Sequence, residues 1–218
     1  MPRIEKREIK PLTEPEISAF LSEIENEPLK DLFTVALFTG MREGEICGLP
    51  WEAVDFINGT VTVKQQLCKE KIKGGKHYIA TTKNDKARTL TVAPFVIDIL
   101  SKIKREQLAD RFAMGQAWEN EFELVFTDKA GHFIVPQTAL KRFKAIASKI
   151  GRPDARFHDL RHTYAVTALQ EGDDVKTVQQ NLGHATASFT LDVYGHVSKK
   201  MKKESAARMQ NYFEKIKA

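Results

Sequence analysis

The chain has 218 residues, 42% of them hydrophobic and 29% charged, with a formal net charge of +5 at pH 7. This length allows a substantial hydrophobic core, and the composition excludes an intrinsically disordered chain. The longest apolar run, about residues 33–38, is too short to span a membrane, and the charged N-terminus is unlike a signal peptide. Two cysteines, Cys47 and Cys68, without metal-binding spacing indicate a reducing compartment, so a cytoplasmic protein is expected.

The first expected element is a helix that follows a charged segment. Residues 1–12 lack helical periodicity and hold prolines near both ends, which indicates a linker or the end of something larger. Thr13 and Glu16 have the spacing of a capping box, which predicts a helix from about Pro15.

Arg42 lies at a predicted junction between two helices. Pro28 is expected to open a helix that Gly40 ends, and residues 43–49 are expected to begin a short new one. The backbone on both sides should therefore hold Arg42 in place.

A small antiparallel sheet of about three strands is expected in the middle of the chain. Alternating residues predict strands over 60–63, 77–82 and 89–92, with turns at 73–76 and 84–87. Lys83 then enters the last turn.

The same region carries a concentration of positive charge. Residues 64–88 contain eight basic residues against two acidic ones, which gives +6 in 25 positions. Such a segment is typical of a contact to a phosphate backbone, but a lysine-rich, solvated hairpin has the same composition. The charge alone does not decide between these interpretations.

The rest of the chain is predicted to be mainly helical. The expected elements are a helix from Pro94, a short strand over 123–127, a helix from Pro136 to a stop at Gly151, helices over 158–171 and 174–182, a helical or turn-like stretch over 188–194, and a last helix over 198–217. The expected fold class is therefore mostly α with one small antiparallel sheet (α+β), and one domain is expected apart from the two ends.

Four residues of reactive type fall within 37 positions near the C-terminus: His158, Arg161, His184 and Tyr194. A tyrosine hydroxyl has a pKa near 10 and becomes a useful nucleophile only beside cationic groups. Arginine provides a planar fork that matches a phosphodiester, and histidine can exchange a proton near neutral pH. Together with Arg42 upstream, the set indicates phosphoryl transfer without a metal.

Each of these residues also has an ordinary structural interpretation. Tyr194 could lie half-buried in the core, His184 could end a helix, and Arg42 could pair with Glu43 or Glu45. His158 and His162 have the spacing of a zinc-binding HExxH helix, but Asp159 replaces the glutamate and an arginine lies inside the motif. Zinc is therefore not expected, and the joint pattern favours a phosphoryl-transfer site.

The ordered strings TGMREGEICGL, TKNDKAR, HDLR and LGH, with a tyrosine ten positions after the last, resemble the tyrosine recombinase family, the phage- and transposon-type integrases. The resemblance runs from about residue 12 to the end. It implies the catalytic residues Arg42, Lys83, His158, Arg161, His184 and Tyr194, the last as nucleophile.

The resemblance also assigns supporting roles. Glu45 takes the acidic position of the first string and is expected to support Arg42. Lys83 is implied as the general acid, although Lys86 lies in the same loop. The candidates for DNA contact are Lys76, Lys86 and Arg88.

By this resemblance the chain is a site-specific recombinase that cleaves and rejoins DNA through a 3′-phosphotyrosyl intermediate, without a cofactor, metal or ATP. The implied partners are double-stranded DNA at attachment or inverted-repeat sites, other copies of the chain in a tetramer on DNA (a monomer when free), an excisionase and a host DNA-bending protein, and no membrane. Two alternatives stay open: relaxation of DNA by a type IB topoisomerase, and DNA binding without cleavage by a regulator.

The expected organisation has three parts: 1–12 as the linker from a missing N-terminal DNA-binding region, 13–197 as the catalytic domain, and 198–218 as a C-terminal helix. That last segment has a charge of +5 and a partial apolar stripe. The stripe could pack on its own domain, or in a pocket on a neighbouring subunit.

Overall fold

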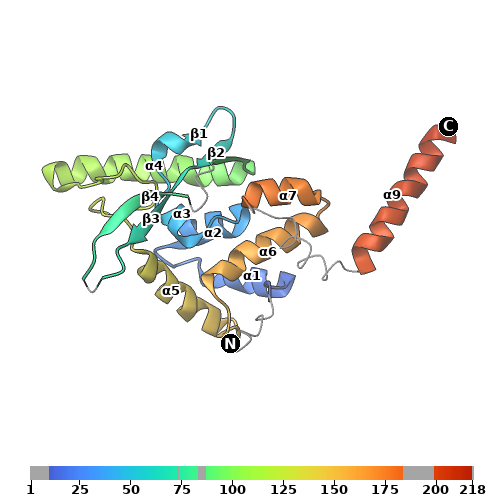
Figure 1. Cartoon of the computed structure of the whole chain (residues 1–218), viewed down its shortest axis with the longest axis horizontal. Helices are drawn as coiled ribbons and strands as arrows, with labels where there is room; N and C mark the ends of the chain where they lie inside the picture. The colour runs from blue at the N-terminus through green and yellow to red at the C-terminus, as the bar shows by residue number, and fades with distance from the viewer. Residues whose placement is uncertain (1–9, 73, 83–86, 184–198, 218) are drawn as a thin grey trace.

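The computed structural model describes residues 10–72, 74–82, 87–183 and 199–217, with side chains in the last helix from residue 206 onward. The described part is mostly helical, with two small antiparallel β structures (Figure 1). None of its helices is long and apolar enough to cross a membrane. The predicted α+β class is therefore confirmed.

The first three helices follow the predicted stops and starts. Helix α1 (Glu14–Glu23) begins at the expected capping box, where the Glu16 carboxylate accepts a hydrogen bond from the Thr13 amide at 2.7 Å. Helix α2 (Lys30–Thr39) ends at Gly40, whose φ of 64° is left-handed. Helix α3 (Glu43–Cys47) follows at once.

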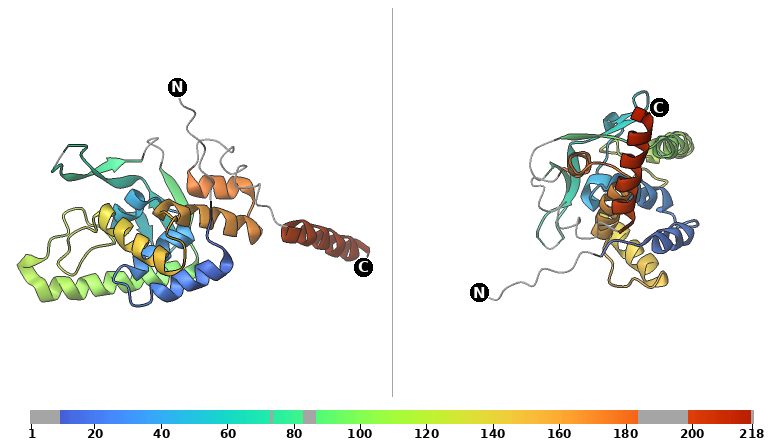
Figure 2. Two further views of the ribbon diagram at one scale, coloured as in Figure 1. Left: turned by 90° about the horizontal axis from the view of Figure 1, so that it is seen from below. Right: turned by 90° about the vertical axis from the view of Figure 1, so that its right-hand side faces the viewer.

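The middle of the chain forms two β structures where the sequence predicted one sheet. Strands β1 (Val54–Asp55), β2 (Thr60–Val63) and β5 (Arg88–Thr91) form a sheet in the order β1-β2-β5. Strands β3 (Gln65–Lys69) and β4 (His77–Thr81) pair separately as a two-stranded ribbon, which projects from the body (Figure 2).

The split has a simple cause in the pairing register. Val63 pairs with Arg88 and Gln65 pairs with Thr81, so one residue separates the paired positions on one side while six residues of sequence separate them on the other. Six residues cannot be matched to one within a ladder, and the pairing therefore divides at this position.

Four further helices complete the body. They are α4 (Pro94–Met114), α5 (Pro136–Lys149), α6 (Phe157–Gln170) and α7 (Val175–Leu182). Short 3-10 turns lie at Trp51–Ala53 and Gly115–Ala117. Each helix lies where the sequence predicted one, and proline at the first turn of α4 and of α5 marks its start.

The predicted strand over 123–127 is wrong. Only isolated bridges, Pro50 with Leu124 and Thr127 with Phe133, are found there. The carbonyls of Leu124 and Val125 accept hydrogen bonds from the Gln107 amide of α4, at 3.2 and 2.8 Å. A side chain thus takes the place that a neighbouring strand would have filled.

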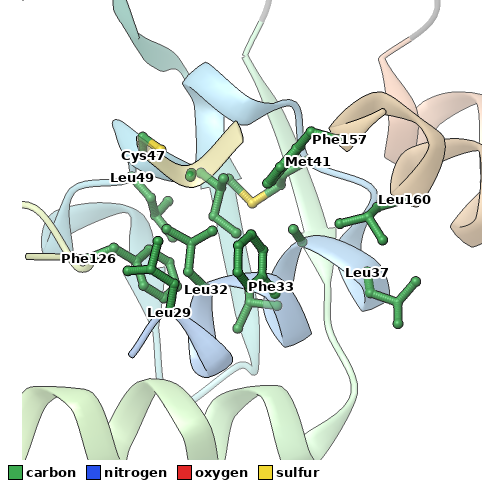
Figure 3. Close-up of a cluster of buried hydrophobic side chains, with 14 of the residues drawn as sticks. Leu29, Leu32, Phe33, Leu37, Met41, Cys47, Leu49, Phe126, Phe157 and Leu160 are labelled. Atoms are coloured by element: carbon green, nitrogen blue, oxygen red, sulfur yellow. The ribbon is translucent and has the colours of Figure 1, made fainter. Parts of the chain in front are cut away.

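The core joins helices that are distant in the sequence. Phe20, Phe33, Phe143 and Phe157, one each from α1, α2, α5 and α6, have neighbouring ring centroids between 5.8 and 6.4 Å apart. All four are almost fully buried, and Figure 3 shows Phe33 and Phe157 among the leucines of α2 and α6. This cluster sets α2 against α6, which places the two strings HDLR and TGMREGE side by side.

Helix α9 (Lys199–Lys217) stands away from the body in Figures 1 and 2. Its apolar side chains Met209, Tyr212, Phe213 and Ile216 are 52–68% exposed. Their spacing puts them on one face of the helix. The stripe is thus largely exposed in the described residues, and its packing on its own domain or on a neighbouring subunit stays a prediction.

Candidate active site

Arg42 is held by the start of α3. It is the residue before the first helical turn, and its amide donates to Oε2 of Glu45 at 2.8 Å. Its Nη1 donates to Oε1 of the same carboxylate at 2.7 Å. The buried Glu45 side chain therefore caps the helix and orients the Arg42 guanidinium, while the Arg42 side chain keeps 35% of its surface exposed.

Arg161 lies at the centre of the site and is 1% exposed. Its Nη1 donates to the Gly40 carbonyl at 2.8 Å, and its Nη2 donates to the Leu182 carbonyl. The side chain thus joins the ends of α2 and α7, where both carbonyls lack a partner within their own helix. Burial and then the charge of Arg42 lower the pKa of Arg161 to about 9, so the group is still charged at neutral pH.

His158 lies one helical turn before Arg161 and keeps contact with solvent. Partial desolvation by the surrounding protein, followed by the charges of Arg161 and Arg42, lowers the pKa of His158 to about 4. Its ring is therefore neutral at pH 7 and can accept a proton. The ring of His162 lies 4.7 Å away, centroid to centroid, nearly perpendicular to it.

The side chain of Arg88 turns inward. Its Nη1 and Nη2 donate to the two Glu45 oxygens at 3.0 and 2.6 Å, and its Nε donates to the Asn181 carbonyl at 2.7 Å. The DNA contact expected of Arg88 stays a prediction, but these contacts count against it. Lys76, by contrast, is exposed on the ribbon.

Burial alone would raise the pKa of Glu45. The hydrogen bonds and charge of Arg88, and then those of Arg42, instead lower it to about 2. The carboxylate is therefore ionised at neutral pH and can hold both arginines.

The remaining candidates, Lys83, Lys86, His184 and Tyr194, lie outside the described residues. The structure thus brings together Arg42 and Glu45 from the start of α3 with His158 and Arg161 from α6, and adds Arg88 from β5. Among the described residues no group of three or more histidine, cysteine or acidic side chains is placed to hold a metal ion.

Sequence reasoning missed a second arginine-based helix start. The Arg156 amide donates to Oδ2 of Asp159 at 2.8 Å, and its guanidinium donates to Oδ1 at 2.9 Å. This repeats the Arg42–Glu45 arrangement at the start of α6, next to His158. The signal was available, because an acidic residue three positions after a helix start is the spacing of a capping box.

Chemically, the described site is a place for an anion. Two guanidiniums and a neutral imidazole lie within mutual electrostatic influence. Fixed cations of this kind can neutralise charge on phosphate oxygens without rearranging during a reaction.

Comparison with known proteins agrees with this chemistry. The model of the phage integrase family matches residues 10–201. A XerC-like tyrosine recombinase from Caldanaerobacter subterraneus subsp. tengcongensis is 32% identical over 216 residues, which covers 94% of this chain and 55% of the relative. The chain spans about half the length of the curated relatives it matches.

Solved structures share the fold. The Tn1549 transposon integrase in complex with a circular intermediate DNA superposes with a TM-score of 0.77 at 20% identity, covering 95% of this chain and 68% of the integrase chain. The catalytic domain of bacteriophage HP1 integrase gives a TM-score of 0.59 at 19% identity, covering 92% of this chain and 95% of that domain.

Proposed function

This chain belongs to the phage integrase family of tyrosine recombinases, and from that membership we propose that it cleaves and rejoins DNA strands through a covalent phosphotyrosine. The observation that carries the proposal is the meeting of Arg42, His158 and Arg161 where α2 ends and α6 begins. Residues 13–197 then constitute the catalytic domain, acting in the cytoplasm where bacterial DNA lies.

In the proposed reaction, the Tyr194 oxygen attacks the scissile phosphorus while the bond from phosphorus to the 5′ oxygen breaks. The products are a 3′-phosphotyrosyl ester and a free 5′ hydroxyl. Rejoining reverses the step with the 5′ hydroxyl of a partner strand. The energy of the broken bond is kept in the ester, so no ATP is consumed.

Arg42 and Arg161 would bind the non-bridging phosphate oxygens and neutralise the charge that develops there. Within the part of the chain that the structure describes, two of the five N–H donors of Arg161 are bonded, to the carbonyls described above, which leaves donors for a phosphate. The buried ion pair with Glu45 keeps Arg42 from swinging into solvent when DNA is absent.

Proton transfer would use two further groups. His158, neutral at pH 7, can accept the phenolic proton of Tyr194 as the oxygen attacks. Lys83 would deliver a proton to the 5′ oxygen as it leaves, and His184 would bind a phosphate oxygen.

Double-stranded DNA is the proposed substrate. The Tn1549 integrase was solved with DNA, and the same fold here carries an exposed ribbon with Lys69, Lys71 and Lys76 at its end. Such a ribbon can follow the phosphate backbone beside the site.

We further propose that strand exchange takes place in a tetramer assembled through α9. In the described residues the apolar stripe of α9 is exposed, while the body has an apolar groove of about 770 Å³ between α1, α2 and α6. Its lining includes Ile17, Leu37, Phe38 and Val166. The α9 helix of a second copy would fill it, and such a head-to-tail contact can close into a ring.

The test of the function is covalent capture. A DNA substrate nicked near the scissile phosphate should leave the wild-type chain in a detergent-resistant adduct, and Tyr194→Phe should bind DNA equally but form none. Cleavage should survive excess EDTA, because protein cations supply the charge. An adduct with Tyr194→Phe would refute the nucleophile, whereas relaxation without exchange, or binding without cleavage, would favour a topoisomerase or a regulator.

A further inference from the structure

Arg88 of β5 connects Glu45 of α3 to the end of α7. It begins β5, five positions after Lys83 in the sequence, yet only 10% of its side chain is exposed. Every nitrogen of its guanidinium donates to a protein oxygen. This is not the arrangement of a residue waiting for a DNA phosphate.

The first connection runs to Arg42. Both Glu45 oxygens are shared: Oε1 accepts from Nη1 of Arg42 and of Arg88, and Oε2 accepts from the Arg42 amide and from Nη2 of Arg88. The two-point contact with Arg88 fixes the plane of the carboxylate. Since Arg42 is bound to the same two oxygens, fixing that plane also fixes the direction of its guanidinium.

The second connection runs to α7. Nε of Arg88 donates to the Asn181 carbonyl, and Arg161 donates to the next carbonyl, that of Leu182. Gly183 packs so closely on this side chain that a Cβ there would lie 2.9 Å from Cδ of Arg88. The last turn of α7, from which the chain continues to His184, is thus seated on Arg88.

We propose that Arg88 is a positioning residue: it holds the Arg42–Glu45 pair and the end of α7 in one fixed arrangement, and it does not bind DNA. The inference rests on the proposed strand cleavage. To contact a phosphate, Arg88 would have to abandon three hydrogen bonds and leave Glu45, 2% exposed, with less charge compensation. That exchange is unfavourable, and Arg42 is better placed to meet the phosphate.

The experiment compares Arg88→Gln with Arg152→Gln in the full chain. Arg152 is a matched control, because its side chain is 14% exposed and it also binds carboxylates, of Glu16 and Asp154, and a backbone carbonyl, that of Lys10. Three quantities are measured for each variant: the Tm, the affinity for a half-site with its salt dependence, and the single-turnover rate of adduct formation.

Arg88→Gln should lower the adduct rate by about 10²-fold, since misplacement by about 1 Å has this effect. Its DNA affinity and salt slope should equal those of the wild type. Arg152→Gln should lower the Tm similarly and leave the rate unchanged. Weaker binding of Arg88→Gln with a salt slope reduced by about one would instead show a phosphate contact and overturn the proposal.

A pH profile tests the route through Glu45. Among the described residues, the charged groups that face this carboxylate are Arg42 at the start of its own helix, Arg88 from β5 and Arg161 from α6. Without Arg88 the pKa of Glu45 should rise, because the burial penalty stays and the main opposing charge is gone. The rate deficit of Arg88→Gln should therefore widen as the pH falls from about 8 to about 5, and Arg88→Lys should recover part of it. If the rate deficit of Arg88→Gln is the same at every pH, and Arg88→Lys does not reduce it, the effect does not pass through Glu45.

Hydrogen exchange gives a readout that needs no DNA. Arg88→Gln should speed exchange of the amides at the end of α7 and in α3, whereas Arg152→Gln should affect α1 and the start of α6 instead. Unchanged exchange at both places in Arg88→Gln would overturn the inference. A wild-type chain that forms no adduct would refute the proposed function, while faster exchange in Arg88→Gln would still support the positioning.

Discussion

Gly40 is the position where a single added methyl group should most clearly disturb both fold and site. Its φ is 64°, and a Cβ would lie 2.6 Å from Cδ2 of Leu182 and 2.7 Å from Cδ1 of Tyr164. Neither neighbour can easily withdraw: Leu182 is fully buried, and the Tyr164 hydroxyl accepts a hydrogen bond from Asn181 at 3.0 Å. Gly40→Ala should therefore carry both backbone strain and overpacking.

The two contributions can be separated with Gly59. Its φ is 63°, and a Cβ there would meet nothing within 4 Å. Gly59→Ala should lower the free energy of unfolding by about 1–2 kcal/mol, through left-handed backbone strain alone. Gly40→Ala should lower it by about 1–3 kcal/mol more, through overpacking. Urea denaturation followed by tryptophan fluorescence, analysed at a common m-value, gives both free energies of unfolding.

Equal losses in the two variants would refute the reasoning, because they would mean that Leu182 and Tyr164 yield at no cost. Gly40→Ala should also slow adduct formation, since the Gly40 carbonyl and the end of α7 both hold Arg161. If Gly40→Ala is destabilised but forms the adduct at the wild-type rate at low temperature, the packing at Gly40 contributes to stability and not to the reaction.

Three further predictions follow from the same contacts. Burial, and then the nearby His158, lowers the pKa of His162 to about 4, so the unfolded chain binds this proton more tightly than the folded one, and the free energy of unfolding should fall by about 3 kcal/mol from this group as the pH drops from about 6.5 to about 4. His162→Gln should therefore make the free energy of unfolding, measured in urea, depend less on pH over that range. An unchanged pH dependence would count against this assignment. Lys83→Ala should slow cleavage of an ordinary phosphodiester severely, and a 5′-phosphorothiolate substrate, whose sulfur leaves without a proton, should restore it; failure of the rescue would move the role to Lys86. Deleting the residues after Lys203 should leave a folded monomer that binds a half-site and fails to assemble synaptic complexes by native gel, and unfolding of that product would place α9 in its own core.

The helices were predictable because their ends are marked in the sequence. Thr13 with Glu16, and Gly40 at a left-handed stop, give local signals whose outcome depends on few distant residues. The same holds for Arg42, whose place between two helices follows from the glycine before it and the acidic residue after it.

The β region and the role of Arg88 were not predictable, because they depend on distant pairing. The sequence around Lys64 carries no signal that the strand pairing divides there, because the division depends on which residue pairs with Arg88 across the sheet. A cluster of basic residues also looks uniform in sequence, yet Arg88 is engaged by a buried carboxylate 43 positions away while Lys76 is exposed. Only the folded chain distinguishes them.

The burial of Arg161 affects how a substitution there is interpreted. Because its guanidinium ties the ends of two helices, replacing it would weaken folding even in a gene copy no longer selected for recombination. A substitution of Arg161 should therefore reduce both folding and activity, whereas a substitution of solvent-facing His158 should reduce activity and leave the fold intact.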